Sequence, residues 1–292
     1  MSKRFLTALT IVALLVAALG PAWASEPDSK VAEEMWVLTL PIPMMAYVVR
    51  PLQKGPLPLA LMNHGESLDP QSRSSFPRAE FRAAALWFAA QGYLVVAPIR
   101  PGFGSTAIDN PETGIFGIYF GEIGDCSAPN FRDPGISIAV VNEWVINELT
   151  EKGMVLRDNT IVIGQSGGGW GALALSSRNH PSIRAIVAFA AGRGGHIDGK
   201  PNNNCAPNRL VEAAAEFGRT ARIPTLWIYT ENDSYFGPAL SKQMFEAFVA
   251  AGGKAEYRLF PSFGNDGHFF IDAAEAIPLW APDVTRFLSS RR

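Results

Sequence analysis

The chain has 292 residues, of which 48% are hydrophobic and 18% charged, the composition of a globular protein long enough to bury a large core. Its formal net charge is −2 and its isoelectric point is near 6.1, so no basic surface indicates a nucleic-acid partner or an anionic membrane. The sequence lacks internal repeats, charge runs and low-complexity tracts, which argues against a repeat protein or a disordered one.

The first residues have the pattern of a cleaved signal peptide. Lys3 and Arg4 precede an apolar run of about 15 residues, fewer than the roughly 20 that cross a bilayer. Ala22–Ala24 then gives the small-x-small pattern of a signal-peptidase site. We expect a signal peptide over residues 1–24, an exported protein in the periplasm or outside the cell, and no membrane contact after cleavage. The alternative is a membrane anchor.

Cleavage after Ala24 removes two of the 25 basic residues and none of the 27 acidic ones, so that the mature chain carries a charge of −4.

Short apolar runs alternate with longer amphipathic stretches from residue 35 onward. The runs expected as strands are residues 36–42, 45–51, 57–63, 93–99, 160–165, 183–190, 225–230 and 255–261. The stretches expected as helices are residues 79–91, 136–151, 170–177, 209–217, 240–251 and 274–288.

The links between these elements predict how the strands pair. Short links join the first two or three strands, which are expected to pair antiparallel, whereas helix-length connections separate the later ones and indicate parallel crossovers. Runs such as "LALMN" and "IVIG" are almost continuously apolar, as in central strands covered on both faces. We therefore predict one three-layer α/β domain over residues 25–292, with a mostly parallel eight-stranded sheet and helices on both faces.

Two long segments, residues 101–132 and 196–208, break this alternation. In open α/β sheets, long loops at the carboxyl ends of the strands form the ligand crevice. Each segment contains one cysteine in a polar stretch, and an oxidising compartment favours pairing. We predict that a Cys126–Cys205 disulfide joins the two loops over the crevice; the alternative is two unpaired structural cysteines. Two cysteines give neither a zinc pattern nor a CxxC redox motif.

A serine stands among glycines in "TIVIGQSGGGWGALAL", between an apolar strand and a small-residue helix. Gly164, Ser166 and Gly168 form G-x-S-x-G at this junction, the setting that a nucleophile elbow requires. The glycines let strand and helix pack closely, and the turn places the serine hydroxyl at the helix N-terminus, where free N–H groups favour negative charge. A flexible Gly-rich loop is the alternative.

A serine nucleophile needs a base, and an acid that orients the base. Of the four histidines, His268 lies in a Gly-rich loop after the last strand, from which it can reach back to Ser166; a solvated loop histidine is the alternative. Glu231 and Asp233 directly follow the strand at 225–230, and either can be the acid.

The same chemistry requires two donors for an oxyanion. The backbone N–H of Gly167 is one, and the loop "MNHGES" supplies the other from Gly65 or Glu66. His64 is expected to orient this loop rather than to act as the base.

These motifs resemble the α/β-hydrolase superfamily, and within it the dienelactone hydrolase-like and prolyl oligopeptidase-like branches. The resemblance covers residues 58–292 and is carried by "MNHGES", "APIRPGFGST", "GQSGGGWG", "YTENDSYF" and "FPSFGNDGHFF", in that order. It implies a triad of Ser166, Asp233 and His268, because the spacing of Asp233 from its strand matches the family pattern, and an acyl-enzyme on Ser166 that water releases. Dienelactone hydrolases proper use a cysteine nucleophile, and no propeller domain fits before the first strand.

We expect an exported serine hydrolase acting on a small ester, lactone or related acyl compound. Phe103, Phe116, Tyr119 and Phe120 could line an acyl pocket or simply pack within the loop. A peptidase or amidase with the same triad is the second hypothesis, motivated by Glu66 as a site for a cationic group; alternatively Glu66 pairs with Arg100. A catalytically silent fold used for binding is the third. No motif indicates a metal, nucleotide or flavin, and no oligomeric state follows from the sequence.

Overall fold

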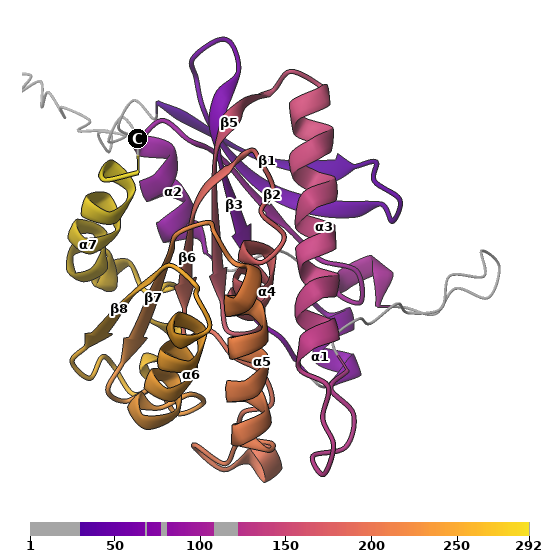
Figure 1. The fold of residues 1–292 in the computed structure, drawn as a ribbon. Coiled ribbons are helices and arrows are strands. Elements are labelled where there is room, and N and C mark those ends of the chain that lie inside the picture. Colours follow the sequence, from indigo (N-terminus) through magenta and orange to yellow (C-terminus); the bar gives the residue numbers. More distant parts are fainter. Residues whose placement is uncertain (1–29, 68, 77–80, 108–121, 292) are drawn as a thin grey trace, which may run out of the picture.

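The computed structural model describes residues 30–67, 69–76, 81–107 and 122–291 (Figure 1). Eight strands form one sheet in the order β1-β2-β4-β3-β5-β6-β7-β8. The strands are β1 (Val31–Leu38), β2 (Met44–Pro51), β3 (Leu57–Asn63), β4 (Leu94–Pro98), β5 (Val155–Gln165), β6 (Ile183–Phe189), β7 (Thr225–Thr230) and β8 (Ala255–Phe260). The helices are α1 (Pro70–Ser74), α2 (Arg82–Ala90), α3 (Arg132–Glu151), α4 (Gly167–Ser176), α5 (Pro207–Thr220), α6 (Pro238–Ala250) and α7 (Ile277–Ser289).

The sheet is mixed but mostly parallel, as the sequence predicted. Strands β3 to β8 pair in parallel, while β2 pairs antiparallel with both β1 and β4. The prediction for the third strand was wrong, because β3 lies between β4 and β5 rather than beside β2. The run "LALMN" is buried on both faces, and only a central position, with helices above and below, gives it such an environment.

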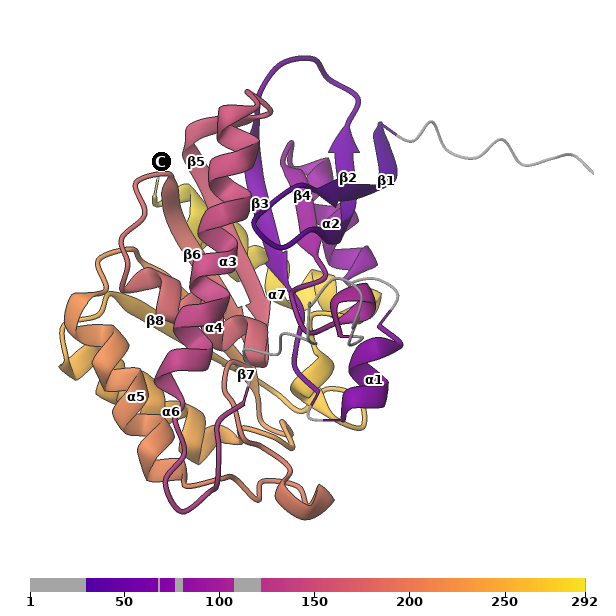
Figure 2. The same cartoon turned by 90° about the vertical axis from the view of Figure 1, so that its right-hand side faces the viewer.

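Helices cover both faces of the sheet, which makes three layers (Figure 2). Helices α3, α4, α5 and α6 share one hydrophobic core with one face, and α2 and α7 share the other core with the opposite face. Successive apolar residues of one strand alternate between the two cores, for example Leu61 in the first and Met62 in the second. This alternation follows from the two-residue period of a strand.

Element boundaries differ from the predicted ones by a few residues. Strand β1 begins earlier, at Val31, because its register with β2 runs from Val31 opposite Pro51 to Leu38 opposite Met44. Helix α5 begins at Pro207 and α6 at Pro238. Proline is favoured in the first turn because an N–H at that position has no hydrogen-bond partner within the helix. Helix α4 begins directly after Ser166, three residues before the position that the sequence indicated.

Candidate active site

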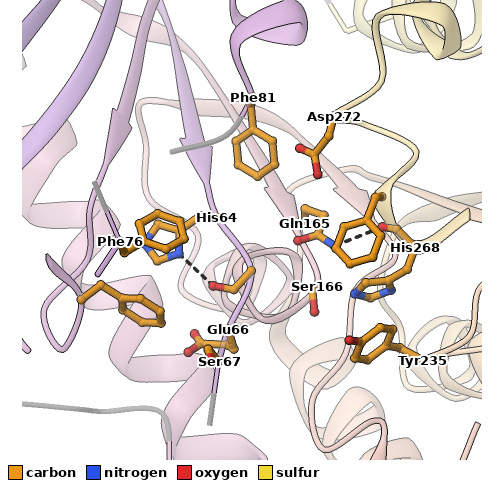
Figure 3. A pocket seen from close by; sticks show the side chains of 13 residues that line it. His64, Glu66, Ser67, Phe76, Phe81, Gln165, Ser166, Tyr235, His268 and Asp272 are labelled. Atoms are coloured by element: carbon orange, nitrogen blue, oxygen red, sulfur yellow. Dashed lines mark hydrogen bonds between the residues drawn. The ribbon is translucent and has the colours of Figure 1, made fainter. Parts of the chain in front are cut away.

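The predicted site residues follow the carboxyl ends of parallel strands. The loop His64–Glu66 follows β3, Ser166 follows β5, Asp233 follows β7, and His268 follows β8. Because these strands run in the same direction, their carboxyl ends lie at one edge of the sheet, where open α/β sheets bind ligands. The structure therefore brings together residues that are up to two hundred positions apart (Figure 3).

Ser166 sits on a strained turn. Its backbone has φ 54° and ψ −123°, a conformation that residues with a side chain rarely adopt. Hydrogen bonds hold the turn: the N–H of Ser166 donates to Phe189 O at 3.0 Å, and its carbonyl accepts from the N–H of Trp170 at 2.9 Å. The strain is thus held by the sheet on one side and the first turn of α4 on the other.

The glycines around Ser166 are required by close contacts. A Cβ atom added at Gly164 would lie 2.4 Å from Gly168 O, and one added at Gly168 would lie 2.3 Å from His64 O. A Cβ atom at Gly167 would lie 2.0 Å from Cγ of Glu66. A side chain at any of these positions would push apart β5, α4 and the loop His64–Glu66. The segment is therefore a fixed turn and not the flexible Gly-rich loop of the alternative.

His268 is paired with Asp233 beside Ser166. His268 Nδ1 lies 3.0 Å from Asp233 Oδ1, and both side chains are buried. The same carboxylate oxygen accepts hydrogen bonds from the N–H groups of Tyr235 at 2.8 Å and Phe236 at 2.9 Å. A carboxylate held by two backbone donors takes its third hydrogen bond from Nδ1–H, which leaves His268 Nε2 as the acceptor nitrogen. Figure 3 shows the imidazole facing the Ser166 side chain.

Glu231, the other candidate for the acid, and the nearby Asp266 have different surroundings from Asp233. Glu231 is exposed to solvent. Asp266 accepts hydrogen bonds from the N–H of His268 at 3.0 Å and from Ser234 Oγ at 2.5 Å. Burial opposes the ionised form of Asp266, but the hydrogen bonds from Ser234 and His268 outweigh it and lower its pKa. Asp266 thus fixes the backbone of the histidine loop.

Tyr235 is stacked between two imidazole rings. Its ring centroid lies 4.0 Å from that of His268 and 3.7 Å from that of His196, and the planes of His196 and Tyr235 differ by 2°. His196 Nε2 lies 2.8 Å from Ser234 Oγ, which anchors the outer ring of the stack. The stack limits how far the His268 ring can tilt away from Ser166. Tyr235 was not among the predicted site residues. The sequence feature that could have indicated it is an aromatic residue two positions after Asp233.

Arg100 holds the loop His64–Glu66 in place. Its Nη1 donates to His64 O at 2.6 Å, and its Nη2 donates to Gly65 O at 3.0 Å. In a trans peptide the carbonyl and the following N–H point in opposite directions. The N–H of Glu66 therefore points away from Arg100, and so does that of Gly65.

His64 is buried within this loop as a neutral ring. Its Nδ1 lies 2.8 Å from Gly65 O, and its Nε2 accepts from the N–H of Arg100 at 3.1 Å. Because Nε2 is an acceptor, Nδ1 must carry the proton. Burial, together with the charge of Arg100, lowers the pKa of His64 to about 3. This is the loop-orienting placement that the sequence analysis expected.

Glu66 forms a buried cluster with two arginines. Its Oε1 lies 2.7 Å from Arg100 Nη2 and 3.0 Å from Arg193 Nη1. Burial favours the protonated carboxyl, but the charges of Arg193 and Arg100 outweigh it and lower the pKa of Glu66 to about 2. The sequence suggested Arg100 as a partner of Glu66 but Arg193 was not predicted. Arg193 could have been found as the one charged residue in the apolar and glycine run "FAAGRGG".

The predicted disulfide joins Cys126 and Cys205, with 5.1 Å between their Cα atoms. Three consecutive asparagines fasten the loop at 196–208: Asn203 Nδ2 donates to Ile197 O at 2.9 Å, Asn204 Nδ2 donates to Tyr235 O at 2.6 Å, and Asn202 Oδ1 accepts from Gly237 N at 3.0 Å. The disulfide loop is therefore bonded to the segment that carries Asp233 and Tyr235.

Phe103 is buried and lines the cavity at Ser166. Phe116, Tyr119 and Phe120 lie outside the described residues.

Within the described ranges, no three His, Cys, Asp or Glu side chains cluster closely enough to hold a metal ion. No helix in that part of the chain combines the length and the apolar character needed to cross a membrane.

Solved structures share this architecture. An acetyl xylan esterase from Paenibacillus sp. R4 superposes with a TM-score of 0.59 at 16% identity, over 92% of this chain and 86% of that one. A protein named as a dienelactone hydrolase from Klebsiella pneumoniae subsp. pneumoniae gives a TM-score of 0.58 at 18% identity, over 87% of this chain and 98% of that one. The chain has the α/β-hydrolase fold.

An acylaminoacyl peptidase from Pyrococcus horikoshii shares the α/β-hydrolase fold with a TM-score of 0.60 at 12% identity. The match covers 89% of this chain but 41% of the peptidase, so this chain spans less than half the length of that protein. No protein-family model matches the sequence. No curated protein matches it either.

Proposed function

We propose that this protein is a serine hydrolase that cleaves a small carboxylic ester, lactone or related acyl compound. The observation that carries the proposal is the His268–Asp233 pair, 3.0 Å between Nδ1 and Oδ1, facing Ser166 on its strained turn. Serine, aspartate and histidine follow one another along the chain in this order, as in α/β-hydrolase triads. Ser166 is the nucleophile, His268 the general base and Asp233 the residue that orients the base.

In the proposed reaction, Ser166 Oγ attacks the substrate carbonyl carbon while His268 Nε2 takes the hydroxyl proton. The negative charge that develops on the carbonyl oxygen is stabilised by the N–H groups of Gly167, at the start of α4, and of Glu66, which points away from Arg100. Each donor contributes about 3 kcal/mol to such a transition state. His268 then protonates the leaving oxygen, and water releases the acyl group from Ser166 by the reverse proton path.

The Glu66 contacts bear on the alternative of a peptidase or amidase. That alternative rests on Glu66 as a site for a cationic peptide terminus, but Arg100 and Arg193 both bind its carboxylate. These contacts weaken the case for a peptidase, so the proposed substrate remains an ester or lactone. Comparing turnover of an ester with turnover of the matching anilide tests this choice; preference for the anilide would favour the peptidase.

Labelling with a fluorophosphonate tests the triad directly. We expect label on the wild-type protein, mapped by peptide mass spectrometry to Ser166, and none on Ser166→Ala. Ser67→Ala is the matched control, because Ser67 lines the same cavity and should leave labelling intact. A folded wild-type protein that takes no label would refute the hydrolase and favour the silent binding fold.

We also propose that residues 1–24 are a signal peptide and that the protein works in the periplasm or outside the cell. The Cys126–Cys205 disulfide supports this location, because disulfides persist in oxidising compartments. N-terminal sequencing of the exported protein should begin at Ser25. Recovery of the intact N-terminus in the membrane fraction would favour an anchor instead.

A further inference from the structure

Ser166 lies between two cavities of different chemistry. One has a volume of about 150 Å³ and includes His268; we name it the phenylalanine cavity. The other has a volume of about 240 Å³ and includes Arg193 and His196; we name it the glycine cavity. Ser166, Glu66, Ser67 and Tyr235 line both, so the reactive hydroxyl is open to each side.

The phenylalanine cavity is mostly aromatic. Its apolar walls are Phe76, Phe81, Phe103 and Phe269, with a carboxylate contributed by Asp272. Phe269 follows His268 directly, and its ring meets the imidazole edge to face at 5.3 Å between centroids. Figure 3 shows Phe76, Phe81 and His268 around the space next to Ser166. Rings in this arrangement suit an aromatic or bulky apolar group.

The glycine cavity is more polar than the phenylalanine cavity. Backbone groups of Gly192, Gly194 and Gly195 form one wall, and the side chains of Arg193 and His196 add hydrogen-bonding groups. Ile123 contributes an apolar surface from the neighbouring disulfide-linked segment. A cavity lined by peptide groups and polar side chains favours a small occupant that can itself form hydrogen bonds.

We propose that the leaving alcohol of the substrate occupies the phenylalanine cavity and that the acyl group occupies the glycine cavity. This assignment rests on the proposed serine-hydrolase function. When the tetrahedral intermediate collapses, the bond between the acyl carbon and the leaving oxygen breaks, and His268 Nε2 gives its proton to that oxygen. The leaving group must therefore lie on the side of His268, and in the described structure His268 lines the phenylalanine cavity.

The acyl carbon keeps its bond to Ser166 Oγ, and its chain extends to the other side, into the glycine cavity. The substrate class that fits is an ester of a short, polar acid, such as a hydroxy acid, with an aromatic or bulky apolar alcohol. Water then attacks the acyl-enzyme from the vacated phenylalanine cavity, His268 takes its proton, and that proton returns to Ser166 as the acid leaves.

The alcohol side and the acyl side of the assignment can be tested separately. Acylation depends on both groups of the ester, whereas deacylation depends on the acyl group alone. The probes are phenyl and methyl 3-hydroxybutyrate, which share an acyl-enzyme, and phenyl butyrate, which lacks the hydroxyl. For the wild type we expect a higher kcat/KM for phenyl 3-hydroxybutyrate than for phenyl butyrate, and the methyl ester serves as the reference for the alcohol-side variant. The burst phase and the rate of acyl release give acylation and deacylation separately.

Phe269→Ala tests the alcohol side. Phe269 is 48% exposed, so its removal should leave the fold intact. We expect kcat/KM for the phenyl ester to fall about tenfold relative to the methyl ester, while deacylation of the shared 3-hydroxybutyryl-enzyme is unchanged. A displaced His268 would change the ratio in the opposite direction, because methanol is the poorer leaving group and depends more on the proton from His268.

Ile123→Ala and Ile123→Phe test the acyl side by widening and narrowing the glycine cavity. We expect Ile123→Ala to favour a six-carbon acyl chain over a four-carbon one, and Ile123→Phe to do the reverse, each with an unchanged ratio between phenyl and methyl esters. Either variant suffices if the other fails to fold. Alcohol preference that moves with Ile123, or acyl preference that moves with Phe269, would overturn the assignment while Ser166 still forms an acyl-enzyme. Absence of any acyl adduct on Ser166 would refute the proposed function, and the assignment with it.

Discussion

Arg100 and Glu66 form a buried ion pair, with 2.7 Å between Nη2 and Oε1 and side-chain exposures of 3% and 13%. The same guanidinium binds the carbonyl oxygens of His64 and Gly65, so one side chain connects the carboxylate to the backbone that precedes it. Arg193 approaches the same Oε1 from the loop after β6. Of the two roles that the sequence left open for Glu66, the contacts favour the structural ion pair.

We expect Glu66→Gln to destabilise the protein by about 3–5 kcal/mol, because it removes the buried carboxylate that two guanidinium groups share. Urea unfolding at neutral pH measures the change in the free energy of unfolding. Glu212→Gln is the control, since its ion pair with Arg209 is exposed and should contribute 1 kcal/mol or less, roughly. Equal losses in the two variants would contradict the structural role of Glu66.

His64 should make the stability of the protein depend on pH. Its pKa is 6.5 in the reference state and about 3 in the folded protein, so the unfolded chain binds more protons between these values. The stability from neutral His64 is fully present above pH 6.5 and is lost as pH falls toward 3, with a slope of up to about 1.4 kcal/mol per pH unit. Glu66, whose pKa falls from 4.5 to about 2, loses stability in the same direction but only below about pH 4.5.

Urea titrations at pH 7, 6 and 5 separate His64 from Glu66, because of these two groups only His64 contributes in that window. We expect His64→Gln to flatten the decline. His180→Gln should flatten the decline less. Burial also lowers the pKa of His180, but this side chain is more exposed to solvent than His64. The interpretation fails if His64→Gln keeps the wild-type slope between pH 7 and 5.

Asp233→Asn should lower kcat by a factor of about 10³ to 10⁴, because a neutral amide does not stabilise the imidazolium that forms on His268 and does not fix the imidazole tautomer that the carboxylate selects. Steady-state hydrolysis of an activated ester measures this loss. Glu231→Gln is the matched control: Glu231 is exposed on the same loop, and its loss should leave kcat near the wild-type value. A larger loss in Glu231→Gln than in Asp233→Asn would reverse the assignment of the acid.

Replacing both cysteines with serine should lower the free energy of unfolding by about 4 kcal/mol, because the disulfide closes a loop of 79 residues in the unfolded chain. Thermal unfolding with and without dithiothreitol measures the effect. The reductant should lower the Tm of the wild type and leave that of the double variant unchanged. An equal shift in both proteins would show that the reductant acts elsewhere.

The sequence alone predicted the layered α/β architecture, the strand-turn-helix around Ser166 and the Cys126–Cys205 disulfide. Each rests on a local signal: apolar periodicity within a strand, glycines adjacent to a serine, or two cysteines in a chain for which export is predicted. The position of β3 was mispredicted, because strand order depends on which runs are buried on both faces, and chain connectivity does not specify that. The chemical roles of Ser166, Asp233 and His268 stay predictions until they are tested.

By itself the sequence determined which residue types were available at the strand ends, since these follow from motifs of a few adjacent residues. Only the tertiary structure decided which of them meet. It set Asp233 rather than Glu231 against His268, joined Glu66 to Arg193, and stacked Tyr235 between His196 and His268. The physical reason is that such contacts join residues far apart in the chain, and their geometry depends on how the parallel strands align their carboxyl ends and how the loops pack there.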